Sequence, residues 1–99
     1  MALQIIWSEN ALEDYQHIVE YLLKEWPINV ASGFVETVEA RVKNLSIFPF
    51  VGIASGKELG IRSIVITKQN LLYYKISASR VEILNIFDTR QDPDKNKYK

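Results

Sequence analysis

The segment from Leu71 to Phe87 constrains the fold most, because two runs of alternating side chains flank the polar break Ser77–Arg80. Successive side chains of a strand point to opposite faces, so each run predicts a strand, and the break predicts an antiparallel hairpin. The first strand divides into Leu72, Tyr74 and Ile76 against Leu71, Tyr73 and Lys75; the second divides into Val81, Ile83 and Asn85 against Glu82, Leu84 and Ile86. We take the first-named set of each strand as scaffold positions and expect function in the charged exit, 88–93.

An apolar run at 3–7 and a helical pattern after it open the chain. The Ile-Ile-Trp content of the run favours a strand, and Ser8 stands where a helix N-cap belongs. Apolar residues then recur at helical spacing until Pro27, which ends the helix. The predicted buried stripe is Leu12, Tyr15, Ile18, Val19, Leu22 and Trp26.

A second amphipathic helix is expected between Asn29, a plausible cap, and Pro49. Gly33 within it suggests close packing of the two helices, because glycine otherwise weakens a helix. Its apolar stripe comprises Ala31, Phe34, Val38, Val42 and Leu45.

A loop over 46–60, with apolar anchors at Ile47, Phe48 and Phe50, leads to a strand over 61–67 and a turn at 68–70. The order is β-α-α-β-β-β. It predicts an α+β fold in which an antiparallel sheet packs against a helical hairpin, with 3–7 joining the sheet as an edge or beside a later strand. The 99 residues predict a single domain spanning 1–99, with a polar, lysine-rich tail from about residue 93.

The composition restricts the chemistry. The chain has no cysteine and a single histidine, His17, which we expect on the surface; we expect neither a metal site nor a cofactor, since the glycines match no phosphate-binding motif. No apolar run is long enough to span a membrane, and a cytoplasmic location is expected. The net charge is zero, but residues 1–56 carry three basic against seven acidic residues and residues 57–99 carry nine against five.

The basic residues of the second half are the candidate site residues. Lys57 precedes one strand, Arg62 opens it, Lys75 lies on the next strand and Arg90 follows the last. Arginine can bind phosphate and stabilise developing negative charge, whereas the alternative is surface solubility with ion pairs to nearby acids. In the antiparallel sheet Arg62 belongs at one end and Arg90 leaves from the other, so whether they share a site stays open.

Several segments together resemble the RelE/ParE superfamily of bacterial type II toxin-antitoxin toxins. These are WSENALEDYQHIVEYLLKEW, the residues at 31–34, LSIFPFVG, Arg62, LLYYKI and VEILNIFDTRQDP, in order along nearly the whole chain. The resemblance implies a plasmid-stabilisation toxin that inhibits growth and is neutralised by a cognate antitoxin. It also implies one of two targets: the ribosome with its mRNA, which the toxin cleaves, or DNA gyrase, which it poisons.

Carried over from the nucleases, the resemblance assigns catalytic roles to Arg62, Arg90, Lys57 and Tyr98. The balanced charge and the absence of a histidine after the last strand argue against a nuclease. The long helical hairpin and the ending DTRQDP are closer to ParE-like or plasmid-stabilisation proteins. Both mechanisms remain open at this stage. A further alternative is a decayed, non-toxic chain that acts only as an antitoxin-binding module.

Overall fold

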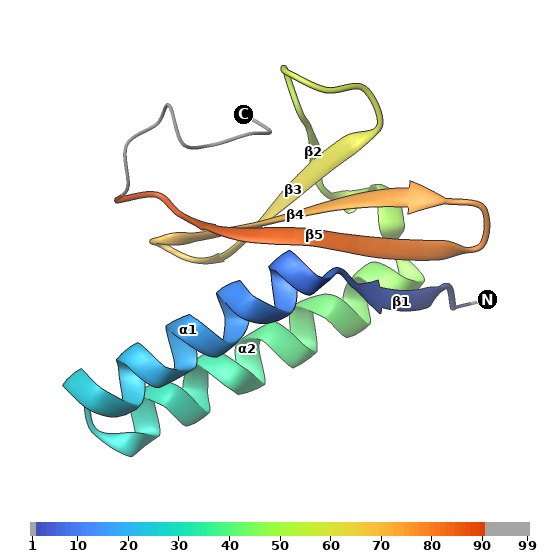
Figure 1. Cartoon of the computed structure of the whole chain (residues 1–99). Coiled ribbons are helices and arrows are strands. Elements are labelled where there is room, and N and C mark those ends of the chain that lie inside the picture. Colours follow the sequence, from blue (N-terminus) through green and yellow to red (C-terminus); the bar gives the residue numbers. More distant parts are fainter. Residues whose placement is uncertain (1, 91–99) are drawn as a thin grey trace.

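A computed structural model describes residues 2–90, and its two helices pack against one face of a five-stranded sheet (Figure 1). The α+β fold is therefore confirmed, and so is the predicted order apart from one additional short strand. The predicted tail from residue 93 lies outside the described residues. The elements are β1 (Gln4–Trp7), α1 (Glu9–Glu25), α2 (Ile28–Ile47), the 3₁₀ helix η1 (Pro49–Val51), β2 (Ile53–Ala54), β3 (Ile61–Thr67), β4 (Asn70–Ser77) and β5 (Arg80–Asp88).

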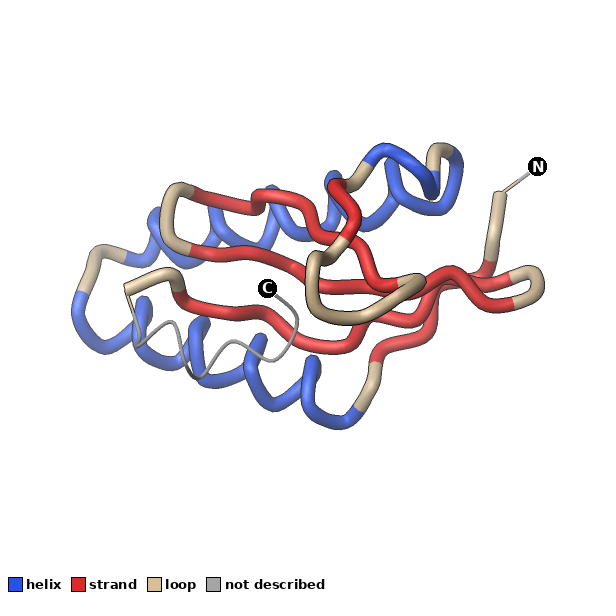
Figure 2. The backbone as a smooth tube through the Cα atoms, turned by 90° about the horizontal axis from the view of Figure 1, so that it is seen from above, coloured by secondary structure: helices blue, strands red, loops and turns tan. Residues whose placement is uncertain are grey.

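The sheet has the strand order β1-β5-β4-β3-β2. The predicted hairpin is β4 and β5, and β3 extends it antiparallel. β1 runs parallel to β5, with Gln4 opposite Arg80, and forms one edge as expected. The additional strand β2 forms the other edge, with Ile53 opposite Ser63. Seen from above, both helices lie beneath the strands, so no helix within residues 2–90 lies over the opposite face of the sheet (Figure 2).

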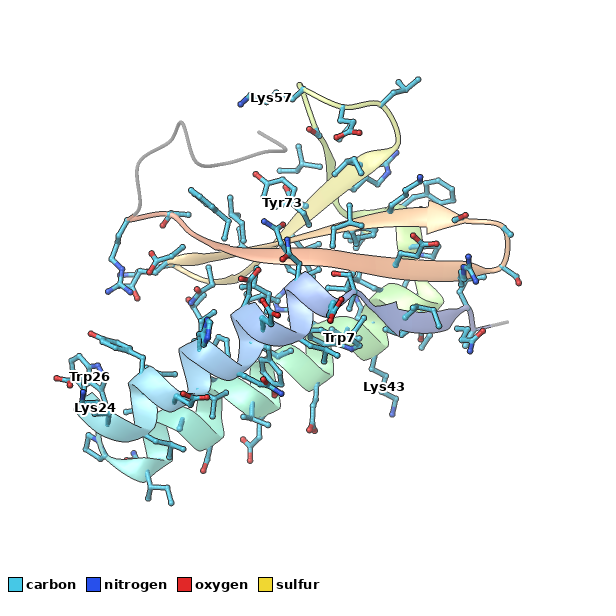
Figure 3. All side chains as sticks on the ribbon, viewed as in Figure 1. Trp7, Lys24, Trp26, Lys43, Lys57 and Tyr73 are labelled. Atoms are coloured by element: carbon cyan, nitrogen blue, oxygen red, sulfur yellow. The ribbon has the colours of Figure 1, made fainter. Side chains whose placement is uncertain are left out.

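Ser8 joins α1 to the sheet. Its hydroxyl accepts a hydrogen bond from the Ala11 N–H (3.0 Å), which confirms the predicted cap, and donates one to the Leu84 carbonyl (2.8 Å). The predicted stripe of α1 is partly wrong, because Leu12 and Trp26 are 43% and 54% exposed while Ala11 is fully buried. Trp26 lies at the end of the helical hairpin farthest from the sheet, where no strand can cover it (Figure 3).

The buried stripe of α2 is confirmed, since all five predicted residues lie in the core. Two expectations about its first half are wrong. The N-cap is Pro27, not Asn29: Pro27 has φ −57° and ψ 151°, outside the helical region, and the helix begins directly after it at Ile28. A Cβ atom on Gly33 would meet nothing within 4 Å, so this glycine does not mark close helix packing.

A β-bulge reverses the facing of the last part of β5. Tyr73 pairs with Asn85 and Tyr74 with Ile83, so Leu84 is an extra residue between them. Beyond it Ile86, not Asn85, joins the core between sheet and helices, and the predicted face of Asn85 is wrong. Directly paired residues share a face, so Asn85 lies with Tyr73 on the face away from the helices.

The apolar side chains form two clusters. The main cluster lies between the helices and the sheet, where Leu72, Tyr74, Val81 and Ile83 are fully buried. The second comprises Ile61, Tyr73 and Phe87. None of the helices within residues 2–90 is long and apolar enough to cross a membrane.

Candidate functional site

The segment after α2 is held in place by the hydroxyl group of Tyr74. This hydroxyl donates to the Pro49 carbonyl (2.7 Å) and accepts from the Gly52 N–H (3.0 Å). Tyr74 is fully buried in the centre of β4, and this burial raises the pKa of its phenol. The phenol therefore stays protonated at neutral pH and can keep donating. The core thereby fixes both ends of the η1 turn.

Gly52 is required in this segment because there is no room for a side chain. A Cβ atom here would lie 2.8 Å from the Ser63 carbonyl oxygen and would clash with the Tyr74 hydroxyl. The φ angle of Gly52 is −73°, which any residue can adopt, so the constraint is space and not backbone conformation. Directly after Gly52 the chain stays beside β3 and pairs with it as β2.

Arg62, predicted as a catalytic residue, contacts the same segment. Its Nη1 donates to the Gly52 carbonyl (2.8 Å) and, at 3.4 Å, to the Phe50 carbonyl. Its guanidinium also lies over the Phe50 ring, 5.3 Å from the centroid, in a cation–π arrangement. Arg62 thus positions the η1 segment from the outside, while Tyr74 does so from the core.

The apolar residues of this segment are exposed. Ile47, Phe48 and Phe50 are 51%, 60% and 69% exposed, so the prediction that they anchor the loop in the core is wrong. The polar contacts of Tyr74 and Arg62 hold the segment instead. These hydrogen bonds are made by the backbone of the segment, so its position does not depend on burying the apolar side chains, which face solvent.

Arg90 binds its own neighbour at the end of β5. Its Nη2 lies 2.8 Å and its Nε 3.0 Å from the two carboxylate oxygens of Asp88. These hydrogen bonds lower the pKa of Asp88. Arg62 pairs with Tyr74, and Asp88 pairs with Asn70, which is four residues away along β4. At about 3.3 Å per residue along a strand and about 4.8 Å between neighbouring strands, the backbones of Arg62 and Asp88 lie roughly 16 Å apart.

Of the other two predicted site residues, only Lys57 lies within residues 2–90. Lys57 is exposed on the loop between β2 and β3, which rises above the sheet face opposite the helices (Figure 3). Its backbone N–H donates to the Ser55 hydroxyl (3.2 Å). Tyr98 lies outside the described residues. The structure therefore separates Arg62 from Arg90, and the catalytic roles stay a prediction.

The family comparison identifies the class of protein. The family described as ParE toxin of the type II toxin-antitoxin system parDE matches residues 5–93. The chain belongs to this ParE toxin family. The prediction of a RelE/ParE superfamily toxin is thereby confirmed. Among curated proteins no match is found.

Solved structures share the fold of this ParE-family toxin. A chromosomal ParDE system from P. aeruginosa has a TM-score of 0.74 at 17% identity, over 88% of this chain and 96% of that chain. A YoeB/ParE toxin from Agrobacterium tumefaciens has a TM-score of 0.65 at 22% identity, over 87% and 98%. The toxin-antitoxin complex RelBE2 from Mycobacterium tuberculosis has a TM-score of 0.60 at 22% identity, over 89% and 99%.

A second feature of the toxin is a cavity of about 910 Å³ between the helical hairpin and the end of the sheet. Asp88 and Arg90 line it together with α1 and α2 residues that the sequence did not assign to a site, including His17, Tyr21 and Val30. The cavity exists because the helices diverge from the strands towards Trp26. One signal was available: Tyr21 and Val30 are apolar residues outside the predicted stripes.

Proposed function

We propose that this ParE-family toxin arrests growth by acting on DNA gyrase through protein contacts, and that it does not cut mRNA. The observation that carries the proposal is the separation of Arg62 from Arg90. An RNA-cleaving site needs its proton-transfer and charge-stabilising groups around one phosphate, within hydrogen-bond reach of the reacting atoms. The backbones at Arg62 and Asp88 are roughly 16 Å apart. The guanidinium of Arg62 is turned to Gly52 and that of Arg90 to Asp88, so the two do not converge on one phosphate.

The surroundings of the two arginines support the same proposal. The guanidinium of Arg62 is engaged by two backbone carbonyls and an aromatic ring, and that of Arg90 by a carboxylate. The net charge of zero also gives the chain no overall attraction to ribosomal RNA. A toxin that acts by contact needs neither a catalytic cluster nor a positive field.

We also propose that a cognate antitoxin neutralises the protein. The family match and the toxin-antitoxin complex among the similar structures support this part of the proposal. The cavity between the hairpin and the sheet is concave and lined by more apolar than polar surface, which suits an antitoxin segment that orders on binding.

Induction of the chain in a bacterial host tests the mechanism. DNA breaks with an SOS response and intact mRNA are expected. Ribosome-bound mRNA fragments without DNA breaks would refute gyrase as the target. Normal growth despite folded protein would instead support the non-toxic binding module.

Arg90→Ala and Lys57→Ala distinguish the two toxin mechanisms. Both positions are exposed at the surface. A nuclease that uses these residues should lose toxicity in both variants, whereas the gyrase mechanism predicts DNA breaks in at least the Lys57→Ala strain. Arg62→Ala is a poorer test because it also removes the hydrogen bonds to Gly52 and Phe50.

A further inference from the structure

The exposed residues around η1 form an apolar surface that the packing of the fold does not explain. We call Phe48, Phe50, Val51, Ile53 and Val65 the η1 patch. Their exposed fractions run from 54% for Val65 to 76% for Ile53. Val51, Ile53 and Val65 also line one shallow groove, which joins the η1 segment to the outer edge of β3. Exposed apolar side chains gathered around one segment are typical of protein interaction sites.

The backbone beneath the patch is fixed. Tyr74 holds Pro49 and Gly52 from the core, and Arg62 holds Gly52 and Phe50 from the surface. The patch therefore loses little conformational freedom when a partner binds, which favours binding to a folded surface. A flexible segment would bury more of its surface in the concave cavity beside the helical hairpin than on this patch.

The charges around the patch specify the partner further. Between Glu39 and Glu58 the sequence contains no acidic residue. Arg41 lines the groove with Val51 and Ile53, and Arg62 lies over Phe50. Within residues 2–90, no carboxylate forms an ion pair with either arginine. The complementary surface is therefore apolar and bordered by acidic side chains.

A second copy of the chain fits this description poorly. A two-fold contact would place the same patch against itself and bring the arginines of both copies together. No acidic residue near the patch in the sequence would compensate their charge. A different protein with acidic side chains at the contact avoids this repulsion.

We propose that the η1 patch is the surface through which this toxin contacts gyrase, at an apolar area of the enzyme bordered by acidic side chains. This inference rests on the proposed function and adds the contacting residues to it. Phe50 and Ile53 supply the apolar contact, and Arg41 supplies the charge. Tyr74 and Gly52 are positioning residues, because they fix the patch from beneath.

Inhibition of purified gyrase by the purified toxin tests the inference. The readout is the toxin concentration that halves supercoiling of a relaxed plasmid, together with the amount of gyrase-cleaved DNA. Phe50→Glu, Ile53→Glu and Arg41→Glu are compared with Leu23→Glu, a matched change on α1 at a position 52% exposed. We expect the toxin concentration that halves supercoiling to increase at least about tenfold for each patch variant and less than about twofold for the control.

The outcomes separate the inference from the proposed function. Wild-type toxin that inhibits gyrase, with patch variants of equal potency, overturns the inference alone. Wild-type toxin without any effect on gyrase overturns both. If the patch variants inhibit gyrase fully but are no longer neutralised by the antitoxin, the patch binds the antitoxin. If they inhibit gyrase fully but change oligomeric state, the patch mediates self-association. Either result overturns the inference. Circular dichroism and urea midpoints verify folding, and Arg41→Glu, an exposed helical change, provides a test if the loop variants unfold.

Discussion

Replacing Tyr74 by phenylalanine removes a single oxygen atom from the centre of β4 and detaches the η1 segment from the core. Two hydrogen bonds are lost, each with a net contribution of about 0.5–1.5 kcal/mol. The Gly52 N–H is buried and would be left without this acceptor, at a cost of about 1–3 kcal/mol that includes one of those bonds. The Pro49 carbonyl is only partly buried and can bind water. We therefore expect a loss of about 2 kcal/mol in the free energy of unfolding.

Urea unfolding followed by circular dichroism measures this loss. We expect a lower midpoint at an unchanged slope, and a decrease of roughly 10 °C in Tm. Tyr21→Phe is the matched control, since Tyr21 is 47% exposed, and it should change the free energy by less than about 0.5 kcal/mol. The Tyr74 variant should also inhibit gyrase less, because its patch is less ordered. A free energy of unfolding equal to that of the wild type would refute the view that this hydroxyl holds the segment.

Three further changes test other contacts. Gly52→Ala should destabilise the protein by at least about 2 kcal/mol, because the added methyl group has no space beside β3; a urea midpoint equal to that of the wild type would contradict this. Asp14→Ala should cost about 1–3 kcal/mol in urea unfolding, because it removes the acceptor for the Ile86 N–H (3.0 Å); stability equal to that of Asp14→Asn would argue against a role for this bond. Arg90→Ala should remove the stabilisation that comes from the lowered pKa of Asp88. That stabilisation is complete above the unfolded pKa of about 3.9 and is lost as the pH falls through the lower folded pKa. The urea midpoints of the wild type and the variant should therefore converge in acid. A difference between the two midpoints that stays constant with pH would be inconsistent with the ion pair.

The sequence by itself determined most of the helices and strands and much of the main core. The helical spacing in α2 placed all five stripe residues correctly, and Ser8 marked the start of α1, because both depend on contacts within a few residues. The alternation in β4 placed Leu72 and Tyr74 in the core for the same reason. The joint order of the motifs was also sufficient for the RelE/ParE assignment.

The tertiary structure decided the facing after the bulge and the surroundings of the candidate site. The extra Leu84 in β5 reverses the facing of Ile86, and only the pairing with β4 reveals it. Phe50 has the apolar side chain of an anchor, yet hydrogen bonds from Arg62 and Tyr74 hold the segment around it and leave its ring exposed. Arg62 has the sequence position of a catalytic residue, but the segment folded against it engages its guanidinium. Local spacing specifies helices and strands, whereas the partners of a side chain depend on which distant segments the fold brings beside it.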